Sequence, residues 1–436
     1  MGPAPAGRSG IEVYMNARHV RLRVMAWRIL RRISVLLLLV MAGAAIWYLA
    51  NRKRIPDLGA ATRVDTRPVD PGDTDLARRA HLRLAQLRSS ETVPGISAAV
   101  ARGGRLVWVE AHGFADLETG APVTTESQFP IGSVSKPLTA SVAMRLFERG
   151  ALSLDEDIRT YVPRFPKKSH TVTARQLLSH QAGIRHYRFM FAPPAFSEMT
   201  LNRQFDSVED SLALFANDDL LFEPDTAFQY STYGYTLLSA AIEGVTRKPF
   251  LQTMADELFG PLQMTSTAAD DSRLANPRRT TDYASVPRDT AVLASPRANS
   301  SNKWAGGGFL STPSDLVRFG IAVLRHEVVS SETAELMFTP RTLRNGTVNP
   351  QNYALGWRTG ALRLTPAAPA TTPIHHHGGS AVGAQSILLL LPETQIVVAI
   401  CGNVYSGGSG DFLQAAADLA RLFMAQPQES RKLRQE

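Results

Sequence analysis

The longest hydrophobic stretch of the chain lies near its N-terminus. Eighteen uncharged residues, ISVLLLLVMAGAAIWYLA, run without interruption from Ile33 to Ala50. As a helix that rises about 1.5 Å per residue, this stretch spans most of a hydrocarbon core about 30 Å thick. Trp47 and Tyr48 lie at its far end, where aromatic side chains favour the membrane interface. The pattern therefore predicts a transmembrane helix over residues 33–50.

Beyond this stretch, the spacing of apolar residues predicts strands near both ends of a folded body and helices between them. Two apolar runs within residues 95–112 flank a Gly-Gly pair, which is a two-residue hairpin signal. A second pair of apolar runs lies within residues 385–401. Apolar residues recur at helical spacing over residues 75–88 and 411–424, whereas residues 137–345 are typical of helices and loops.

This order predicts an α/β fold in which both chain ends complete one antiparallel sheet. N- and C-terminal helices flank the sheet, and a largely helical subdomain is inserted into it. The Pro-, Gly- and Asp-rich stretch after the hydrophobic helix is typical of a tether. We expect a basic N-terminal segment over residues 1–32, a transmembrane helix over residues 33–50 and a linker over residues 51–76. One folded domain over residues 77–426 and a polar tail over residues 427–436 are expected to follow.

The net charge of the chain belongs to its N-terminus. The whole chain carries 47 Lys and Arg against 39 Asp and Glu, a formal charge of +8. Residues 1–56 carry ten of these bases and one acid, which is +9, so the remainder carries −1. A nearly neutral body gives no reason to expect a nucleic-acid partner. The single cysteine, Cys401, excludes an internal disulfide and a cysteine-based zinc site.

The basic residues also predict a topology. Six arginines within residues 18–32 precede the hydrophobic stretch, and three basic residues follow it at positions 52–54. The positive-inside bias places the N-terminus in the cytoplasm and exports the body. We therefore expect a single-pass signal anchor in the inner membrane of a Gram-negative bacterium, with the body in the periplasm. A cleaved signal peptide, a mitochondrial presequence and a buried core helix are the alternatives; in a eukaryotic source the body would face the mitochondrial intermembrane space.

One short motif carries candidate chemistry. Ser133 and Lys136 form a Ser-x-x-Lys pair, and residues three apart share one face of a helix. A serine hydroxyl becomes a good nucleophile when a neighbouring base, such as an amine, takes its proton. A helix that begins at Ser133 also directs free N–H groups towards a developing oxyanion. Alone, the pair is a weak signal, since two polar residues in the first turn of a helix explain it equally well.

Two further motifs strengthen this signal by their order. Residues 230–232, Tyr-Ser-Thr, precede a helical stretch, and residues 377–380, His-Gly-Gly-Ser, precede a strand-like run. This order resembles the penicillin-recognising serine hydrolases, which include class C β-lactamases, D-alanyl-D-alanine carboxypeptidases and family VIII esterases. The stretches LLSHQAGI, RHY, WAGGGFLSTPSDLVRFG and YALGW extend the resemblance over about residues 77–425. The RHY and WAGGGFLSTPSDLVRFG stretches are similar to the mitochondrial-type serine β-lactamase-like proteins and their bacterial relatives.

The resemblance implies a β-lactamase/transpeptidase-like fold and assigns roles to individual residues. Ser133 would be the acyl-forming nucleophile, Lys136 would relay its proton, and Tyr230 would carry a proton to the leaving group. A charged lysine favours the phenolate of Tyr230, whereas burial lowers the pKa of Lys136, so either residue can be the base. His377 would occupy the place of the family's basic residue. The backbone N–H groups of Ser133 and Ser380 would form the oxyanion hole.

Three departures from the family pattern narrow the expected substrate. His377, Gly378 and Gly379 stand where Lys-Thr-Gly is common, so the fixed positive charge and the hydroxyl that hold a terminal carboxylate are missing. Thr232 stands where an asparagine is frequent. We expect an internal peptide bond as the substrate first, an ester or lipid second and a β-lactam third.

The remaining expectations concern partners and weaker candidates. We expect no cofactor and no metal. The resemblance allows a homo-oligomer, and a non-catalytic, filament-forming protein is the rival interpretation. His375 and His377 face one side of a strand and His376 the other, which argues against a zinc site there. His180 and His186 are expected to make local hydrogen bonds, and residues 306–308, Gly-Gly-Gly, to form a tight turn instead of a phosphate loop.

Overall fold

A computed structural model describes residues 2, 10–56, 58, 64–68, 74–192, 195–286, 289–363, 370–407 and 410–424. The chain divides into two compact units, residues 1–52 and residues 53–436. The polar tail expected at residues 427–436 lies outside the described residues.

The first unit is one long helix, α1 (Gly10–Asn51). Its segment Met25–Asn51 has a mean hydropathy of 2.3 and is long and apolar enough to cross a membrane, and none of it is buried against protein. Large apolar side chains such as Leu38, Leu39 and Trp47 are more than half exposed. This exposure does not fit the alternative of a buried core helix, because apolar side chains there would be covered by other protein elements.

The second unit is built on an antiparallel sheet. Among the described residues, this sheet has eight strands. Seven of them lie in the order β13-β14-β15-β16-β3-β4-β2, and β5 pairs with β4. The bounds are β2 (Val64–Pro68), β3 (Gly95–Arg102), β4 (Arg105–Asp116), β5 (Ala121–Pro122), β13 (Arg358–Arg363), β14 (Thr371–Ala381), β15 (Ala384–Leu391) and β16 (Ile396–Gly402). The predicted sheet and both predicted strand pairs are therefore confirmed.

Two features of the chain determine this topology. Gly103 (φ 58°) and Gly104 (φ 74°) join β3 to β4, as the hairpin signal predicted, because a tight hairpin turn of this kind needs two residues with positive φ. Strand β16 pairs with β3, with Ile396 opposite Arg102, so the C-terminal strands complete the sheet begun by the N-terminal ones. The stretch expected to be a linker also contributes strand β2 at the sheet edge and a short strand, β1 (Lys53–Arg54).

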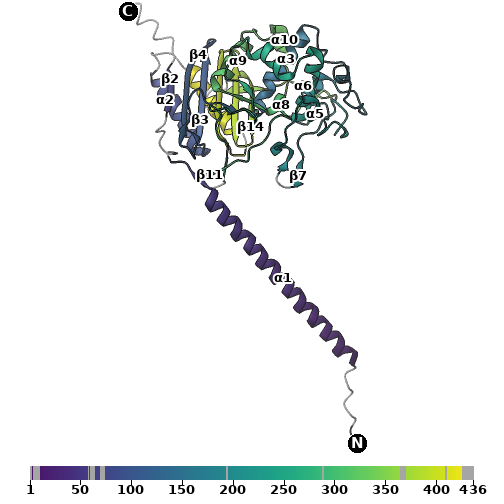
Figure 1. Ribbon diagram of the computed structural model, residues 1–436. Helices are drawn as coiled ribbons and strands as arrows, with labels where there is room; N and C mark the ends of the chain where they lie inside the picture. Colours follow the sequence, from purple (N-terminus) through teal and green to yellow (C-terminus); the bar gives the residue numbers. More distant parts are fainter. Residues whose placement is uncertain are drawn as a thin grey trace, which may run out of the picture. The chain divides into compact units, whose positions relative to one another are not determined.

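Helices cover both faces of the sheet. On one face lie α2 (Thr74–Ser90) and α11 (Gly410–Met424), and α9 (Pro313–Leu324) packs on the other. Figure 1 shows α2 beside β2, β3 and β4, with the helical subdomain on the opposite side of the sheet. Alternate residues of the strands face the two layers: Ala98 joins the core under α2 and α11, whereas Ala99 joins the core under the helical subdomain.

The helical subdomain lies between β5 and β13 in sequence. Its longer helices are α3 (Ser135–Glu148), α6 (Thr232–Thr246) and α10 (Ser331–Phe338). Side-chain caps explain where several of these helices begin; the Ser231 hydroxyl accepts the Gly234 N–H at 3.0 Å and starts α6. Its shorter elements are η1 (Gly132–Val134), η2 (Ile158–Thr160), α4 (Ala174–Leu178), η3 (Glu198–Thr200), α5 (Val208–Leu212), α7 (Phe250–Met254), η4 (Ala255–Phe259) and α8 (Trp304–Gly307).

Short strands connect this subdomain to the main sheet. They form separate small sheets with the orders β1-β11-β10-β17, β6-β12-β9 and β7-β8. Their bounds are β6 (Phe129–Pro130), β7 (Phe189–Ala192), β8 (Ala195–Ser197), β9 (Ala268–Ala269), β10 (Tyr283–Ser285), β11 (Ala291–Ala294), β12 (Phe309–Ser311) and β17 (Val404–Tyr405). The architecture as a whole matches the predicted antiparallel sheet with terminal helices and a helical insertion.

Candidate active site

Ser133 lies in the 3₁₀ turn η1, between β6 and the first residue of α3. Two glycines allow this turn to lie directly against strand β14. Gly132 has φ +49°, and a Cβ there would come within 2.7 Å of the Ser380 backbone. A Cβ on Gly379 would come within 2.0 Å of the Ile131 carbonyl oxygen. Larger residues would push η1 away from the strand, so these glycines set the position of Ser133.

Lys136 lies in the first turn of α3, on the same face as Ser133. Its Nζ is 3.3 Å from Ser133 Oγ, 3.2 Å from Thr232 Oγ1 and 2.6 Å from the carbonyl oxygen of Gly306. The structure therefore brings the predicted Ser-x-x-Lys pair together with the predicted Thr232. The Gly306 carbonyl, from α8, is a partner that spacing in the sequence did not indicate.

The side chain of Lys136 is completely buried. Burial lowers the pKa of its amine well below the usual 10.5, and the positive charge of Arg358 lowers the pKa further. No carboxylate among the described residues forms an ion pair with it. An unprotonated amine has two N–H donors and one lone pair. With the donors directed to Gly306 and Thr232, the lone pair is available to the Ser133 hydroxyl.

Tyr230 immediately precedes the cap of α6, and its ring lies beside Lys136, with Nζ 4.6 Å from the ring centroid. Its hydroxyl is buried and has no hydrogen-bond partner among the described residues. Burial raises the pKa of Tyr230 to about 12, and the nearby Arg358 and Ser133 offset part of this rise. Tyr230 is therefore a neutral phenol at neutral pH, and its hydroxyl is free of hydrogen bonds to the residues that the structure describes.

Two histidines hold the backbone that carries Tyr230 and Thr232. His180 Nδ1 accepts the Ser231 N–H at 3.2 Å, and His186 Nδ1 accepts the Thr232 N–H at 3.2 Å. Burial lowers the pKa of His180 well below 6.5 and that of His186 to about 4, so both rings are neutral acceptors. The prediction of local hydrogen-bonding roles is confirmed by these contacts.

His377 is completely buried on β14 and contacts other protein groups. Its Nδ1–H donates to the Gly378 carbonyl at 2.7 Å, and its Nε2 accepts from the Tyr353 hydroxyl at 2.9 Å. Burial lowers its pKa well below 6.5, so the ring is neutral. His375 stacks on Phe338 at a ring-centroid distance of 3.9 Å. His377 lies on the same face of β14, with its ring centroid 6.2 Å from that of Tyr230, which agrees with the predicted alternation of the three histidines.

The positive charge beside Tyr230 comes from Arg358, at the start of β13. Its Cζ is 5.3 Å from the ring centroids of both Tyr230 and Tyr353, and one guanidinium nitrogen donates to Gln351 Oε1 at 2.8 Å. Sequence reasoning missed this residue. The only available signal was its position directly after the YALGW stretch, and pairing of β13 with β14 is what places it at the site.

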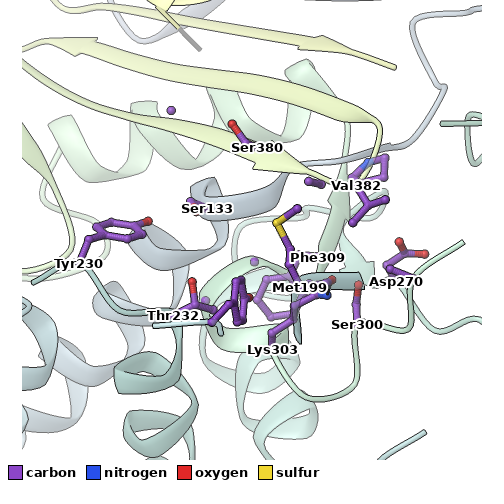
Figure 2. Close-up of a pocket in the computed structure, with 18 of the residues that line it drawn as sticks. Ser133, Met199, Tyr230, Thr232, Asp270, Ser300, Lys303, Phe309, Ser380 and Val382 are labelled. Atoms are coloured by element: carbon purple, nitrogen blue, oxygen red, sulfur yellow. Dashed lines mark hydrogen bonds between the residues drawn. The ribbon is translucent and has the colours of Figure 1, made fainter. Parts of the chain in front are cut away.

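These residues open onto a cavity of about 440 Å³. Figure 2 shows Ser133 between Ser380 on one side and Thr232 on the other, with Tyr230 at one end. The cavity walls include Ser133, Tyr230, Thr232, Arg358, His376, Gly378 and Ser380. The structure thus brings together the predicted Ser133, Lys136, Tyr230, Thr232, Gly378, Gly379 and Ser380, and it places His377 next to Tyr230 and Arg358.

Comparison with known proteins agrees with this geometry. The family profile described as Beta-lactamase matches residues 82–423. The chain belongs to the beta-lactamase family. It is 30% identical to the human mitochondrial serine beta-lactamase-like protein LACTB over 391 residues, which cover 71% of each chain. It is 26% identical to esterase EstB of Burkholderia gladioli, over 70% of this chain and 84% of the esterase.

A solved structure shows the same fold. The octameric penicillin-binding protein homologue of Pyrococcus abyssi superimposes with a TM-score of 0.66 at 22% identity, over 80% of this chain and 77% of the other. Membership of the beta-lactamase family makes this chain a serine hydrolase, and it confirms the family predicted from the three motifs.

The far wall of this beta-lactamase-family cavity carries charges that sequence reasoning missed. Arg279 donates to Asp270 at 2.9 Å and to Asp282 at 2.7 Å. Burial raises the pKa of Asp282 to about 6, although Arg279 opposes the rise. Lys303 donates to the Met199 carbonyl at 2.7 Å, and burial lowers the pKa of its amine to about 8. Asp270, Arg279 and Asp282 lie close together in sequence, whereas Lys303 comes from a later segment; Asp270 and Lys303 both line the cavity (Figure 2).

Proposed function

We propose that this chain is a membrane-anchored serine hydrolase that forms an acyl-enzyme at Ser133 and acts on peptide bonds. The observation that carries the proposal is the 3.3 Å contact between the buried Lys136 Nζ and the partly buried Ser133 Oγ. A lysine at this position without a carboxylate partner is suited to accept a proton, because its burial favours the neutral amine.

The proposed reaction begins when the Lys136 lone pair takes the Ser133 proton while Oγ attacks the substrate carbonyl carbon. The backbone N–H groups of Ser133 and Ser380 hold the oxyanion that forms. Tyr230, with its unpartnered hydroxyl, gives a proton to the leaving amine as the C–N bond breaks, and the proton on Lys136 replaces the one that Tyr230 lost. Water then attacks the acyl-enzyme with the same groups acting in reverse, and Ser133 is regenerated.

A free strand edge supports a peptide as the substrate. Within the described residues, β13 pairs with β14 only from Thr371 to His376. Residues Gly378 and Ser380, further along β14, line the cavity beside Ser133 without a strand partner on that edge. An extended peptide can hydrogen-bond to such an edge through its own N–H and C=O groups. A simple ester lacks the N–H groups that would use this edge fully.

Two alternatives have observations in their favour. Esterase EstB is a relative over 84% of its own length, and the acyl-enzyme chemistry applies equally to an ester or lipid substrate. The Pyrococcus abyssi homologue is octameric, which is consistent with a homo-oligomer, including a non-catalytic assembly. The arrangement of Ser133, Lys136 and Tyr230 argues against the non-catalytic alternative, since an assembly role does not require a buried lysine that contacts a serine hydroxyl and has no carboxylate partner among the described residues.

A covalent probe separates catalysis from a purely structural role. Full-length protein in detergent is treated with a fluorescent fluorophosphonate, and the labelled residue is identified by mass spectrometry. We expect one adduct, on Ser133. Ser133→Ala is expected to lose the adduct, and Ser331→Ala, which changes an exposed serine of α10, is expected to keep it. Absence of a Ser133-dependent adduct would overturn the proposal.

A matched substrate pair then separates a peptidase from an esterase. Peptide and ester substrates with the same acyl group are compared by kcat/KM in the wild-type protein and in Ser133→Ala. Ser133-dependent hydrolysis of the peptide supports the proposal. Ser133-dependent hydrolysis of the ester alone would replace the peptide substrate by an ester.

The proposed location follows from the apolar segment of α1 and its basic flank. We propose a single-pass signal anchor over residues 33–50 in the inner membrane, with the body in the periplasm; for a mitochondrial protein, as the human relative LACTB is named, the equivalent compartment is the intermembrane space. Protease added from the periplasmic side is expected to digest the body and leave residues 1–32 protected. Protection of the body until the cytoplasmic side is opened would reverse this topology.

A further inference from the structure

A second cluster of polar side chains lies on the face of the sheet opposite the catalytic cavity. Glu110 and His112 alternate in β4 with Val109 and Ala111, which belong to the core beneath the helical subdomain. The two polar residues therefore point to the other face, under α2. His81, from α2, lies directly against them. Sequence spacing gives no hint of this cluster, since His81 and Glu110 are 29 residues apart.

The two imidazole rings converge on a single carboxylate oxygen. His81 Nδ1 lies 2.8 Å from Glu110 Oε1, and His112 Nε2 contacts the same oxygen. The ring centroids of the two histidines are 4.7 Å apart. One ligand atom from each of the three residues lies within 4.8 Å of the other two. Two imidazole nitrogens and a carboxylate oxygen form one of the ligand sets that proteins use for zinc.

The charge balance of the cluster favours a cation. The side chain of Glu110 is 5% exposed and that of His112 is completely buried. Among the described residues, the ionic contacts of Glu110 are with these two histidines, and no lysine or arginine pairs with it. A buried carboxylate is costly unless positive charge compensates it. A divalent ion held between the three side chains supplies that charge directly.

The cluster also has the freedom and the access that ion binding requires. His112 Nδ1 is buried and makes no hydrogen bond within the described residues, so an ion bound at Nε2 replaces only the contact of that atom with Glu110. The side chain of His81 is 33% exposed, which leaves a route for an ion and for a water as the fourth ligand. Ligands around tetrahedral zinc are about 3.3 Å apart, so small side-chain rotations close the site.

We propose that His81, Glu110 and His112 bind one divalent transition-metal ion of the zinc class. The ion joins α2 to β4 and so holds the first helix of the body on the sheet. Because the ligands face away from the catalytic cavity, the ion has a structural role and takes no part in the proposed hydrolysis. The proposal is independent of the identity of the substrate and of the role of Ser133.

The test uses full-length protein in detergent, purified without a histidine tag and stripped of metal with a chelator. Zinc is titrated by calorimetry and cobalt by visible absorption, and the thermal midpoint is measured with and without zinc. We expect one equivalent of zinc to bind, the thermal midpoint to rise, and cobalt to give the visible bands of a four-coordinate site.

Variants separate a metal site from a simple hydrogen-bonded triad. His81→Ala removes a ligand at a partly exposed position, and Glu110→Gln keeps the shape of the buried side chain; each is expected to weaken zinc binding at least a hundredfold. His170→Ala changes an exposed histidine elsewhere and is expected to bind zinc as the wild type does. Equal zinc affinity in the wild type, His81→Ala and Glu110→Gln, or no bound equivalent in the wild type, would overturn the proposal.

Discussion

Lys136 Nζ lies 3.3 Å from Ser133 Oγ, while two other acceptors, on Thr232 and Gly306, take up its remaining contacts. The pair shares one face of a short helical segment, and its surroundings keep the amine buried and away from carboxylates. In the proposed reaction, the reactivity of the serine therefore depends on the protonation state of this one lysine.

Replacing Lys136 by arginine introduces a permanent positive charge and removes the base. A guanidinium stays protonated in proteins, so it cannot take the Ser133 proton. We expect Lys136→Arg to slow acylation by a fluorophosphonate about 10²- to 10⁴-fold, the usual contribution of a general base. This rate is measured by stopping the labelling reaction at successive times and separating the labelled protein on gels. Lys248→Arg, at an exposed lysine, is the control, and equal rates in Lys136→Arg and the wild type would remove Lys136 from the mechanism.

Replacing Tyr230 by phenylalanine removes a hydroxyl that makes no hydrogen bond within the described part of the chain. Catalysis is expected to fall about 10²-fold or more, because proton transfer to the leaving group is lost. The thermal midpoint is expected to stay close to that of the wild type, since no hydrogen bond is broken. Tyr161→Phe is expected to lower the thermal midpoint and to leave catalysis unchanged. The Tyr161 hydroxyl donates to Glu156 and accepts from the Ser153 N–H, far from the site. A large loss of stability in Tyr230→Phe would indicate a structural role instead.

The pH dependence of kcat/KM should follow the amine of Lys136. Acylation needs the unprotonated form, so the rate rises with pH through a pKa well below 10.5 and then levels off while Tyr230, with its pKa of about 12, stays protonated. Arg358 lowers the pKa of Lys136, so Arg358→Gln is expected to move the rising limb to higher pH. Arg344→Gln, at an exposed arginine, should not move it. A neutral substrate is used, and an unshifted limb in Arg358→Gln would contradict the argument.

Strand β14 should not tolerate a methyl group where η1 packs against it. A Cβ at Gly379 meets the Ile131 carbonyl at 2.0 Å, so Gly379→Ala is expected to displace Ser133 and to cost about 1–3 kcal/mol in the free energy of unfolding. Gly360→Ala is the matched control on the neighbouring strand β13, where the nearest atom is 3.7 Å away. Denaturant unfolding and the rate of Ser133 labelling give the two readouts. Equal effects of the two substitutions would mean that the close approach is unimportant.

Local patterns predicted those parts of the fold and site that depend on neighbouring residues. The hairpin around Gly103 and Gly104 follows from two adjacent residues, and the Ser133–Lys136 pair from helical periodicity. The motif order placed Tyr230 and Thr232 correctly because the resemblance extends over most of the chain. In these cases, the number of residues between two positions determines how their side chains lie relative to one another.

Other parts of the site could not be predicted, because they depend on contacts between distant segments. Arg358 reaches Tyr230 only when β13 pairs with β14, and the Gly306 carbonyl reaches Lys136 only when α8 packs against α3. The proposal of Lys136 instead of Tyr230 as the base also rests on the structure. Burial lowers the pKa of one and raises the pKa of the other, and burial is a property of the folded chain.

The pairing of β16 with β3 sets a strict order of assembly for the body. Strand β3 ends at Arg102, whereas β16, one of its two neighbours in the sheet, begins at Ile396. One edge of β3 therefore has no partner until almost all of the body has been synthesised. A nascent chain that stops before Ile396 already contains Ser133, Lys136 and Tyr230 but has an uncovered edge along β3, which favours aggregation. A premature stop near the C-terminus should therefore inactivate the protein as completely as loss of the nucleophile.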